Sequence, residues 1–124
     1  EGSSSRDFIF VEDMANGLMK CALNGKPSET YNLASGKETT IAELAAIINE
    51  AAENPTPPEL LPARDWDRSG KRFGSTEKAR RELGFEAEIE IGEGIPRVVA
   101  WTRENKDLIR TCMKRHAPFL LNSR

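Results

Sequence analysis

The chain has 124 residues, a net charge of −2 and 38% hydrophobic residues, so we expect one domain with a thin core. Acidic and basic residues interleave without a basic arm, and we therefore expect no nucleic acid partner. No apolar run approaches the roughly 20 residues of a membrane span, so we expect no membrane partner. The two cysteines are widely spaced and are expected to be free thiols. Because no signal peptide is visible either, we expect a cytoplasmic location.

The first third of the chain alternates between strand and helix patterns. After a loop over residues 1–5, residues 6–11 alternate apolar and polar side chains, which predicts a strand. A helix is then predicted from Glu12, where acidic side chains suit the positive end of the helix dipole, to Asn24, which a glycine follows. A short buried strand is predicted over 30–34.

The next helix has the clearest local signals. Thr40 and Glu43 form a capping-box pattern, which predicts a helix that begins at Ile41. The helix should end before Pro55, because the residue preceding a proline avoids the helical region. A proline-rich connector follows, in which residues 59–61 are predicted as one short strand.

The C-terminal half is predicted to be mainly helical. Residues 63–74 read as a polar loop, 75–83 as a helix that Gly84 ends, and 87–91 as extended chain. The last helix is predicted to begin near Glu93 and to continue with an apolar side as far as about residue 112. Residues 115–124 show no period and are expected to form a loose tail.

Several kinds of chemistry have no residues to support them. Tyr31 is the one tyrosine and Ser35 stands four positions later, so a Tyr-x-x-x-Lys proton-transfer pair is absent. The glycines form no G-x-G-x-x-G set that could cradle a dinucleotide pyrophosphate. His116 is the single histidine, and the scattered cysteines do not complete a zinc site with it. We therefore expect no catalytic residue, no cofactor site and no metal site in this chain.

Two arginines are candidates for binding a phosphate group. Arg6 begins the first predicted strand, and Arg64 lies in the polar loop with Asp67 three residues later. Guanidinium forks match phosphate geometry and keep their charge, so the pair suggests a phosphate-bearing ligand. Alternatively, Arg6 pairs with a carboxylate at the start of the strand. The basic cluster over 68–72 is either a solvated turn or part of the ligand site.

Five segments, in register along the chain, resemble the C-terminal part of the extended short-chain dehydrogenase/reductase family, the NAD-dependent epimerases and dehydratases of nucleotide sugars. The first segment resembles the R-D-F-[IV]-x-V-x-D-[VM]-A signature, and the second resembles Y-N-[IL]-[GA]-S-G. The five segments are Arg6 to Ala15, Tyr31 to Gly36, Thr40 to Ala45, Lys78 to Phe85 and Glu93 to Ile95.

The resemblance implies an α/β fold that consists of a C-terminal substrate-binding lobe plus the last helix and strand of a Rossmann-type domain. Residues 6–38 would form the edge of the Rossmann layer and residues 39–114 the lobe. In this family NAD and the Tyr-x-x-x-Lys pair belong to the N-terminal half. NAD would therefore be bound in the complete enzyme by residues absent from this chain.

The resemblance also assigns site residues. Arg6 and Arg64 would contact the diphosphate of a nucleotide-diphosphate sugar, and Asp67 would accept hydrogen bonds from ribose hydroxyls. The loop departs from the family pattern, because Asp65-Trp66 replaces Pro-Gly and the following stretch is about one residue longer. Arg72 could therefore share or take over a phosphate contact. Trp66 would either cover the site, stack on a base or simply pack.

Three functional hypotheses follow. The first is the nucleotide-sugar-binding part of an NAD-dependent epimerase/dehydratase, inactive in isolation. The second is a stand-alone nucleotide-sugar-binding module without catalysis, and the third is a structural fragment ordered by self-association. Because a strand at 30–34 would lack sheet neighbours, we also expect a homodimer or a domain-swapped oligomer.

Overall fold

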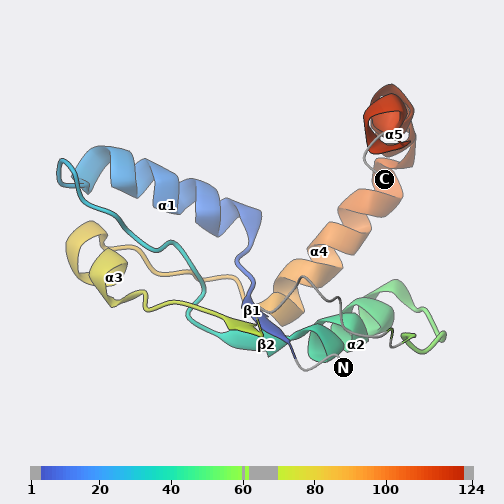
Figure 1. Cartoon of the computed structure of the whole chain (residues 1–124), viewed down its shortest axis with the longest axis horizontal. Coiled ribbons are helices and arrows are strands. Elements are labelled where there is room, and N and C mark those ends of the chain that lie inside the picture. Colours follow the sequence, from blue (N-terminus) through green and yellow to red (C-terminus); the bar gives the residue numbers. More distant parts are fainter. Residues whose placement is uncertain (1–3, 60, 62–69, 122–124) are drawn as a thin grey trace.

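The computed structural model describes residues 4–59, 61 and 70–121, with side chains as far as Ala117. This part of the chain has five helices arranged around a small sheet (Figure 1). The elements in chain order are β1 (Ser5–Asp7), α1 (Val11–Asn24), β2 (Glu38–Thr40), α2 (Ile41–Ala52), β3 (Lys71–Arg72), α3 (Glu77–Leu83), α4 (Ile91–Glu104) and α5 (Lys106–Leu121). The α/β class predicted from the resemblance is confirmed.

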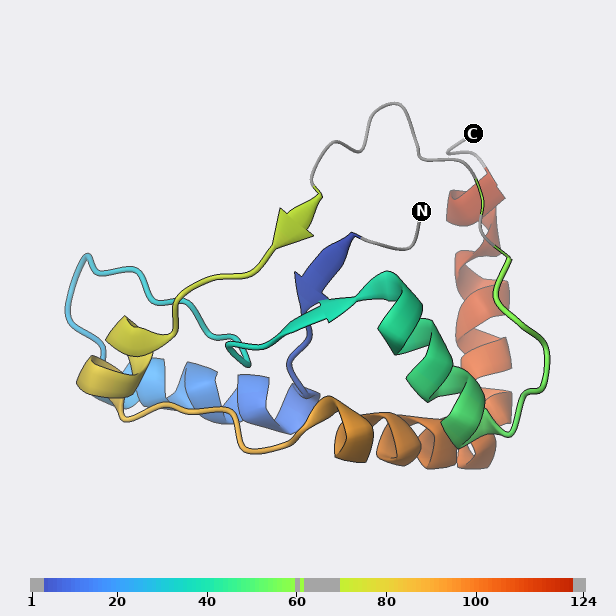
Figure 2. The same ribbon diagram turned by 90° about the horizontal axis from the view of Figure 1, so that it is seen from below.

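The sheet has the order β2-β1-β3, with β1 antiparallel to β2 and parallel to β3. It lies at the middle of an open, elongated structure, with α1 and α3 towards one end and α2 towards the other (Figures 1 and 2). The helix α4 leads from the sheet region to α5. β1 is the central strand, and therefore every strand contact in the described part involves residues 5–7.

Local signals fix the ends of two helices as predicted. At the start of α2, the Thr40 hydroxyl accepts from the Glu43 amide at 3.1 Å, and the Glu43 carboxylate accepts from the Thr40 amide at 2.7 Å. The capping box is therefore confirmed. At the end of α3, Gly84 adopts a left-handed conformation with φ +64°, which confirms Leu83 as the last helical residue.

Of the first two predicted strands, one is partly right and the other is wrong. The strand predicted over 6–11 ends at Asp7, because residues 8–10 pair with no strand in the described part and Val11 already begins α1. The strand predicted over 30–34 is wrong, because these residues form no strand. Side chains fix this segment instead: the Tyr31 hydroxyl donates to Glu82 at 3.2 Å, and Lys78 donates to the Thr30 carbonyl at 2.9 Å.

The connector and the C-terminal region also differ from the prediction. Leu60 of the predicted 59–61 strand lies outside the described residues, and the polar loop ends in an unpredicted strand, β3. The last helix begins at Ile91 and is divided at Asn105 into α4 and α5. The loose tail is wrong over 115–121, which are helical. Arginine, alanine and leucine, which this segment contains, have high helix propensity even without an apolar stripe.

The core is small and lies between α1 and α3. Ala79, Leu83 and Phe85 are its buried apolar residues, and Phe85 has no exposed surface. The partly buried residues that pack against them are Ile9, Cys21, Tyr31, Leu33 and Ala87. Gly17 permits this packing, since a Cβ atom there would lie 3.0 Å from both Phe85 and Leu33.

Large apolar side chains remain exposed on α1, which leads to a prediction about association. Val11 and Leu18, two turns apart on one side of the helix, are 70% and 58% exposed. Apolar patches of this kind mark association surfaces. We therefore expect size exclusion with light scattering to give a mass of at least two chains.

A pair of variants tests whether this helix carries the association. Leu18→Lys should shift the mass towards 13.8 kDa, because it places a charge on the side of α1 that Leu18 shares with Val11. Leu61→Lys is the matched control, since Leu61 is 68% exposed but lies in the connector. A compact monomer for the unmodified chain would contradict the expectation.

No helix in the described residues is both long and apolar enough to cross a membrane.

Candidate phosphate-binding site

Two of the predicted site residues, Arg6 and Arg72, occupy facing positions on neighbouring strands. Arg6 of β1 is the register partner of Arg72 in β3 and of Thr39 in β2. Residues directly opposite each other on adjacent strands project from the same face of a sheet. Both arginine side chains therefore project from the same face of the sheet, although the two residues are 66 positions apart in the sequence.

The two arginines differ in their contacts. Arg6 donates through Nη1 to the carbonyl oxygens of Ser5 at 2.7 Å and Gly70 at 2.9 Å. Arg72 is exposed, and no hydrogen bond or ion pair joins its side chain to another residue of the described part. Arg6 thus has a role in holding the start of β3, whereas Arg72 is presented to solvent.

The other predicted ligand residues belong to the polar loop that precedes β3. Arg64, Asp67 and Trp66 lie outside the described residues. Their convergence with Arg6 stays a prediction. Arg72 is close to this segment in the chain, since the described part resumes at Gly70 and β3 begins at Lys71.

A polar cluster that sequence reasoning missed lies on the other side of the same strands. The hydroxyl of Ser5, a fully buried residue, donates to Glu38 Oε1 at 2.5 Å. Lys71 Nζ lies 3.2 Å from the same oxygen. The Ser5 hydrogen bond and then the Lys71 cation hold the pKa of Glu38 below its ordinary value. The three residues are 33 or more positions apart, which is why no sequence pattern showed them.

Two aspartates near the sheet have structural roles. Asp7 accepts three hydrogen bonds, from the Ser35 amide at 2.7 Å, the Ser35 hydroxyl at 2.6 Å and the Gly36 amide at 2.9 Å. Asp13 is 5% exposed and accepts from the Ile89 amide at 2.9 Å. These carboxylates hold distant backbone segments against β1 and α1.

An apolar cavity of about 270 Å³ lies between the 8–11 segment and α4. Its walls include Phe8, Phe10, Leu44 and Ile95. Arg97 lies 4.5 Å from the centre of the Phe10 ring and forms an ion pair with Glu12 at 2.6 Å. A second cavity of about 450 Å³ continues past Phe10 towards Trp101. Sequence reasoning found these apolar residues but not the groove they form.

The described residues do not fit the pyrophosphate of a dinucleotide. Such a group binds at a helix N-terminus through free amides and a favourable dipole. Acidic side chains occupy the first turn of every described helix: Glu12 and Asp13 in α1, Glu43 in α2, Glu77 in α3, Glu93 in α4 and Asp107 in α5. Like charge at these positions disfavours a pyrophosphate.

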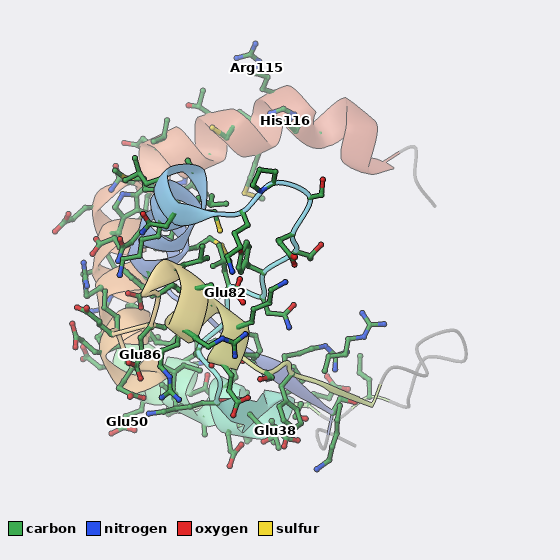
Figure 3. The ribbon with its side chains drawn as sticks, turned by 90° about the vertical axis from the view of Figure 1, so that its left-hand side faces the viewer. Glu38, Glu50, Glu82, Glu86, Arg115 and His116 are labelled. Carbon is green, nitrogen blue, oxygen red and sulfur yellow. The ribbon has the colours of Figure 1, made fainter. Side chains whose placement is uncertain are left out.

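Metal and proton-transfer chemistry are equally unsupported in the described part. No group of three or more histidine, cysteine or acidic residues there could hold a metal ion. Tyr31 bonds to Glu82 and carries Lys78 4.8 Å above its ring, so this tyrosine joins α3 to the preceding loop. His116 is exposed on α5, at the opposite side of the molecule from Glu38 (Figure 3).

Comparison with known sequences supports one family, although no family model matches the chain. The chain is 31% identical to a UDP-glucose 4-epimerase of Mycolicibacterium smegmatis over 83% of its own length. It is 32% identical to a bifunctional UDP-glucose and UDP-xylose 4-epimerase of Arabidopsis thaliana over 85% of its length. The chain spans about a third of these relatives, 33% and 31% respectively.

Comparison with solved structures agrees. The Bordetella bronchiseptica enzyme WbmF, in complex with NAD⁺ and UDP, matches 98% of this chain with a TM-score of 0.81 and 50% identity, over 35% of its own chain. The epimerase Mth375 of Methanothermobacter thermautotrophicus matches 90% with a TM-score of 0.84 and 42% identity, over 33% of its chain. The chain therefore belongs to the extended short-chain dehydrogenase/reductase family and corresponds to the C-terminal part of its NAD-dependent UDP-sugar epimerases and dehydratases.

Proposed function

We propose that this chain is the nucleotide-sugar-binding part of an NAD-dependent epimerase or dehydratase and that its arginines clamp the diphosphate. The observation that carries the proposal is the facing register of Arg6 and Arg72 on β1 and β3. Relatives in this family are solved with UDP or with UDP-glucose. A guanidinium pair on one sheet face suits a diphosphate, because Arg72 presents to solvent a fork that matches phosphate geometry and Arg6 adds a second positive charge beside it.

The contribution of this chain to the reaction is to hold the substrate. Fixing a diphosphate anchors the attached sugar relative to the groups that react with it, and such positioning can supply roughly 7–11 kcal/mol of a barrier at best. NAD would supply hydride transfer from a site formed by residues outside these 124. The acidic helix N-termini support this division, and so does the structural use of Tyr31. The isolated chain should therefore bind a nucleotide sugar, bind no NAD and turn over nothing.

Two further expectations belong to this proposal. The division into a Rossmann-edge part over 6–38 and a lobe over 39–114 stays a prediction, as does a cytoplasmic location.

The exposed apolar face of α1 favours one alternative, a structural fragment ordered by self-association. Binding measurements separate the two, since a purely structural fragment would have no affinity for a nucleotide sugar at any state of assembly.

The proposal is tested by calorimetry with UDP-glucose. Arg72→Ala should lower the affinity at least about tenfold, because a hydrogen bond to a charged group contributes roughly 1.5–3 kcal/mol. Arg6→Ala and Arg64→Ala should lower it similarly. Arg72 is the cleanest of the three positions, since Arg6 also bonds to the Gly70 carbonyl.

The matched control is Arg110→Ala. Arg110 is 70% exposed and pairs with Asp107 on α5, so the variant removes a guanidinium without touching the sheet. Its affinity should equal that of the unmodified chain. Unchanged affinity in all three site variants would remove the clamp from the proposal, and absence of any UDP-glucose binding would overturn it.

A further inference from the structure

The strand that carries Arg72 has little backbone support of its own. β3 consists of two residues, and its pairing with β1 extends over Ser5↔Lys71 and Arg6↔Arg72. The Ser5 amide also donates to the Gly70 carbonyl at 3.1 Å. Isolated pairings this short are marginal in water. Side-chain bonds are therefore needed to define where β3, and with it Arg72, lies.

Glu38 provides such a bond across the whole width of the sheet. It belongs to β2, at the opposite edge from β3, yet one of its oxygens accepts from Ser5 on the central strand at 2.5 Å and lies 3.2 Å from Lys71 Nζ on β3. Figure 3 labels Glu38 beside the sheet. A single carboxylate oxygen thus connects the two outer strands over the middle one.

The Ser5 bond separates Glu38 from an ordinary surface ion pair, whereas Lys71, its other partner, is 72% exposed. An exposed pair contributes little, because solvent screens it and both side chains lose freedom. The Ser5 hydroxyl, however, belongs to a fully buried residue, and an unpaired hydroxyl there would carry a desolvation penalty. The lowered pKa of Glu38 agrees with bonding to the ionised carboxylate, with Ser5 as its first cause.

The alternation of side chains connects this cluster to the arginine pair. Ser5 and Lys71 each precede one of the two arginines and therefore project from the opposite face of the sheet. Fixing Ser5 against Lys71 sets the register that brings Arg6 opposite Arg72. We propose that Glu38 is a positioning residue for the diphosphate clamp and acts through Arg72. This inference rests on the proposed function.

The primary test compares Glu38→Gln with the unmodified chain for UDP-glucose affinity. We expect affinity to fall about three- to tenfold, as for coupled neighbours in one network. Lys71→Gln should reproduce the loss, whereas Lys71→Arg keeps the cation and should retain the affinity. Glu53→Gln is the matched control, because Glu53 pairs with Arg103 at 3.5 Å and is 82% exposed, away from the sheet.

A double-mutant cycle separates positioning from general damage. If Glu38 acts through Arg72, Glu38→Gln should have no further effect on affinity in an Arg72→Ala background. Hydrogen exchange provides a readout that needs no ligand: Glu38→Gln should raise exchange in a peptide covering residues 70–74 and leave α2 and α3 unchanged. This local signature also distinguishes the variant from one that fails to fold.

The outcomes are distinguishable from failure of the proposed function. Unchanged affinity in Glu38→Gln while Arg72→Ala weakens binding overturns the positioning role alone. An equal loss in both backgrounds also overturns it, because Glu38 would then act elsewhere. Absence of UDP-glucose binding by the unmodified chain overturns the proposed function and this inference with it.

Discussion

Phe85→Ala is expected to lower the free energy of unfolding by about 3–5 kcal/mol, the cost of removing a fully buried aromatic ring. Phe85 has no exposed surface, and only Ala79 and Leu83 accompany it as buried apolar residues of the described part. A core with so few buried side chains cannot compensate for the packing contacts that the missing ring would have made. Domains of this size have a total stability of roughly 5–15 kcal/mol, so the variant should lose a large share of it.

Phe73→Ala is the control for this variant. Phe73 is 57% exposed, so the same chemical change there should cost less than about 1 kcal/mol. Urea unfolding followed by circular dichroism measures both variants. The protein concentration must be equal in each experiment, because association would add to the apparent stability. Equal midpoints for the two variants would show that the core between α1 and α3 does not carry the stability.

Asp7→Asn should destabilise the chain by about 2–3 kcal/mol, because it replaces a charged acceptor of three hydrogen bonds. The Asp7 carboxylate accepts from the Ser35 amide, the Ser35 hydroxyl and the Gly36 amide. An asparagine side chain keeps one acceptor oxygen but turns its NH₂ group towards an N–H donor. One of these donors must then lose its partner.

The position of this bond gives the variant a second effect. Asp7 follows Arg6 in β1 and ties that strand to the turn at Gly36, which adopts φ +76° just before β2. Loosening the turn should weaken the β1–β2 pairing, so thermal melting should show a lower midpoint. Asp107→Asn is the control, since Asp107 is 96% exposed and pairs with Arg110 on α5. Similar midpoints for the two asparagine variants would contradict a structural role for Asp7.

Part of the candidate site could be predicted from the sequence. Residue type and family resemblance predict Arg6 and Arg72 as phosphate-binding candidates. Their adjacency could not be predicted, because β3 has two residues and no apolar alternation to reveal it. Glu38 escaped prediction for a related reason: its partners Ser5 and Lys71 lie 33 positions away on either side in the chain. Arg64 and Asp67 lie outside the described residues, and their part in the site stays a prediction.

The sequence by itself determined the features whose hydrogen bonds close within one helical turn. The Thr40–Glu43 capping box and the left-handed Gly84 follow from neighbouring residues and appear as predicted. Tertiary structure decided the strand order, the side-chain bonds that replace a strand around Tyr31 and the meeting of Arg6 with Arg72. Each of these joins residues more than 30 positions apart, and no local pattern specifies which distant partner a backbone or side-chain group will find.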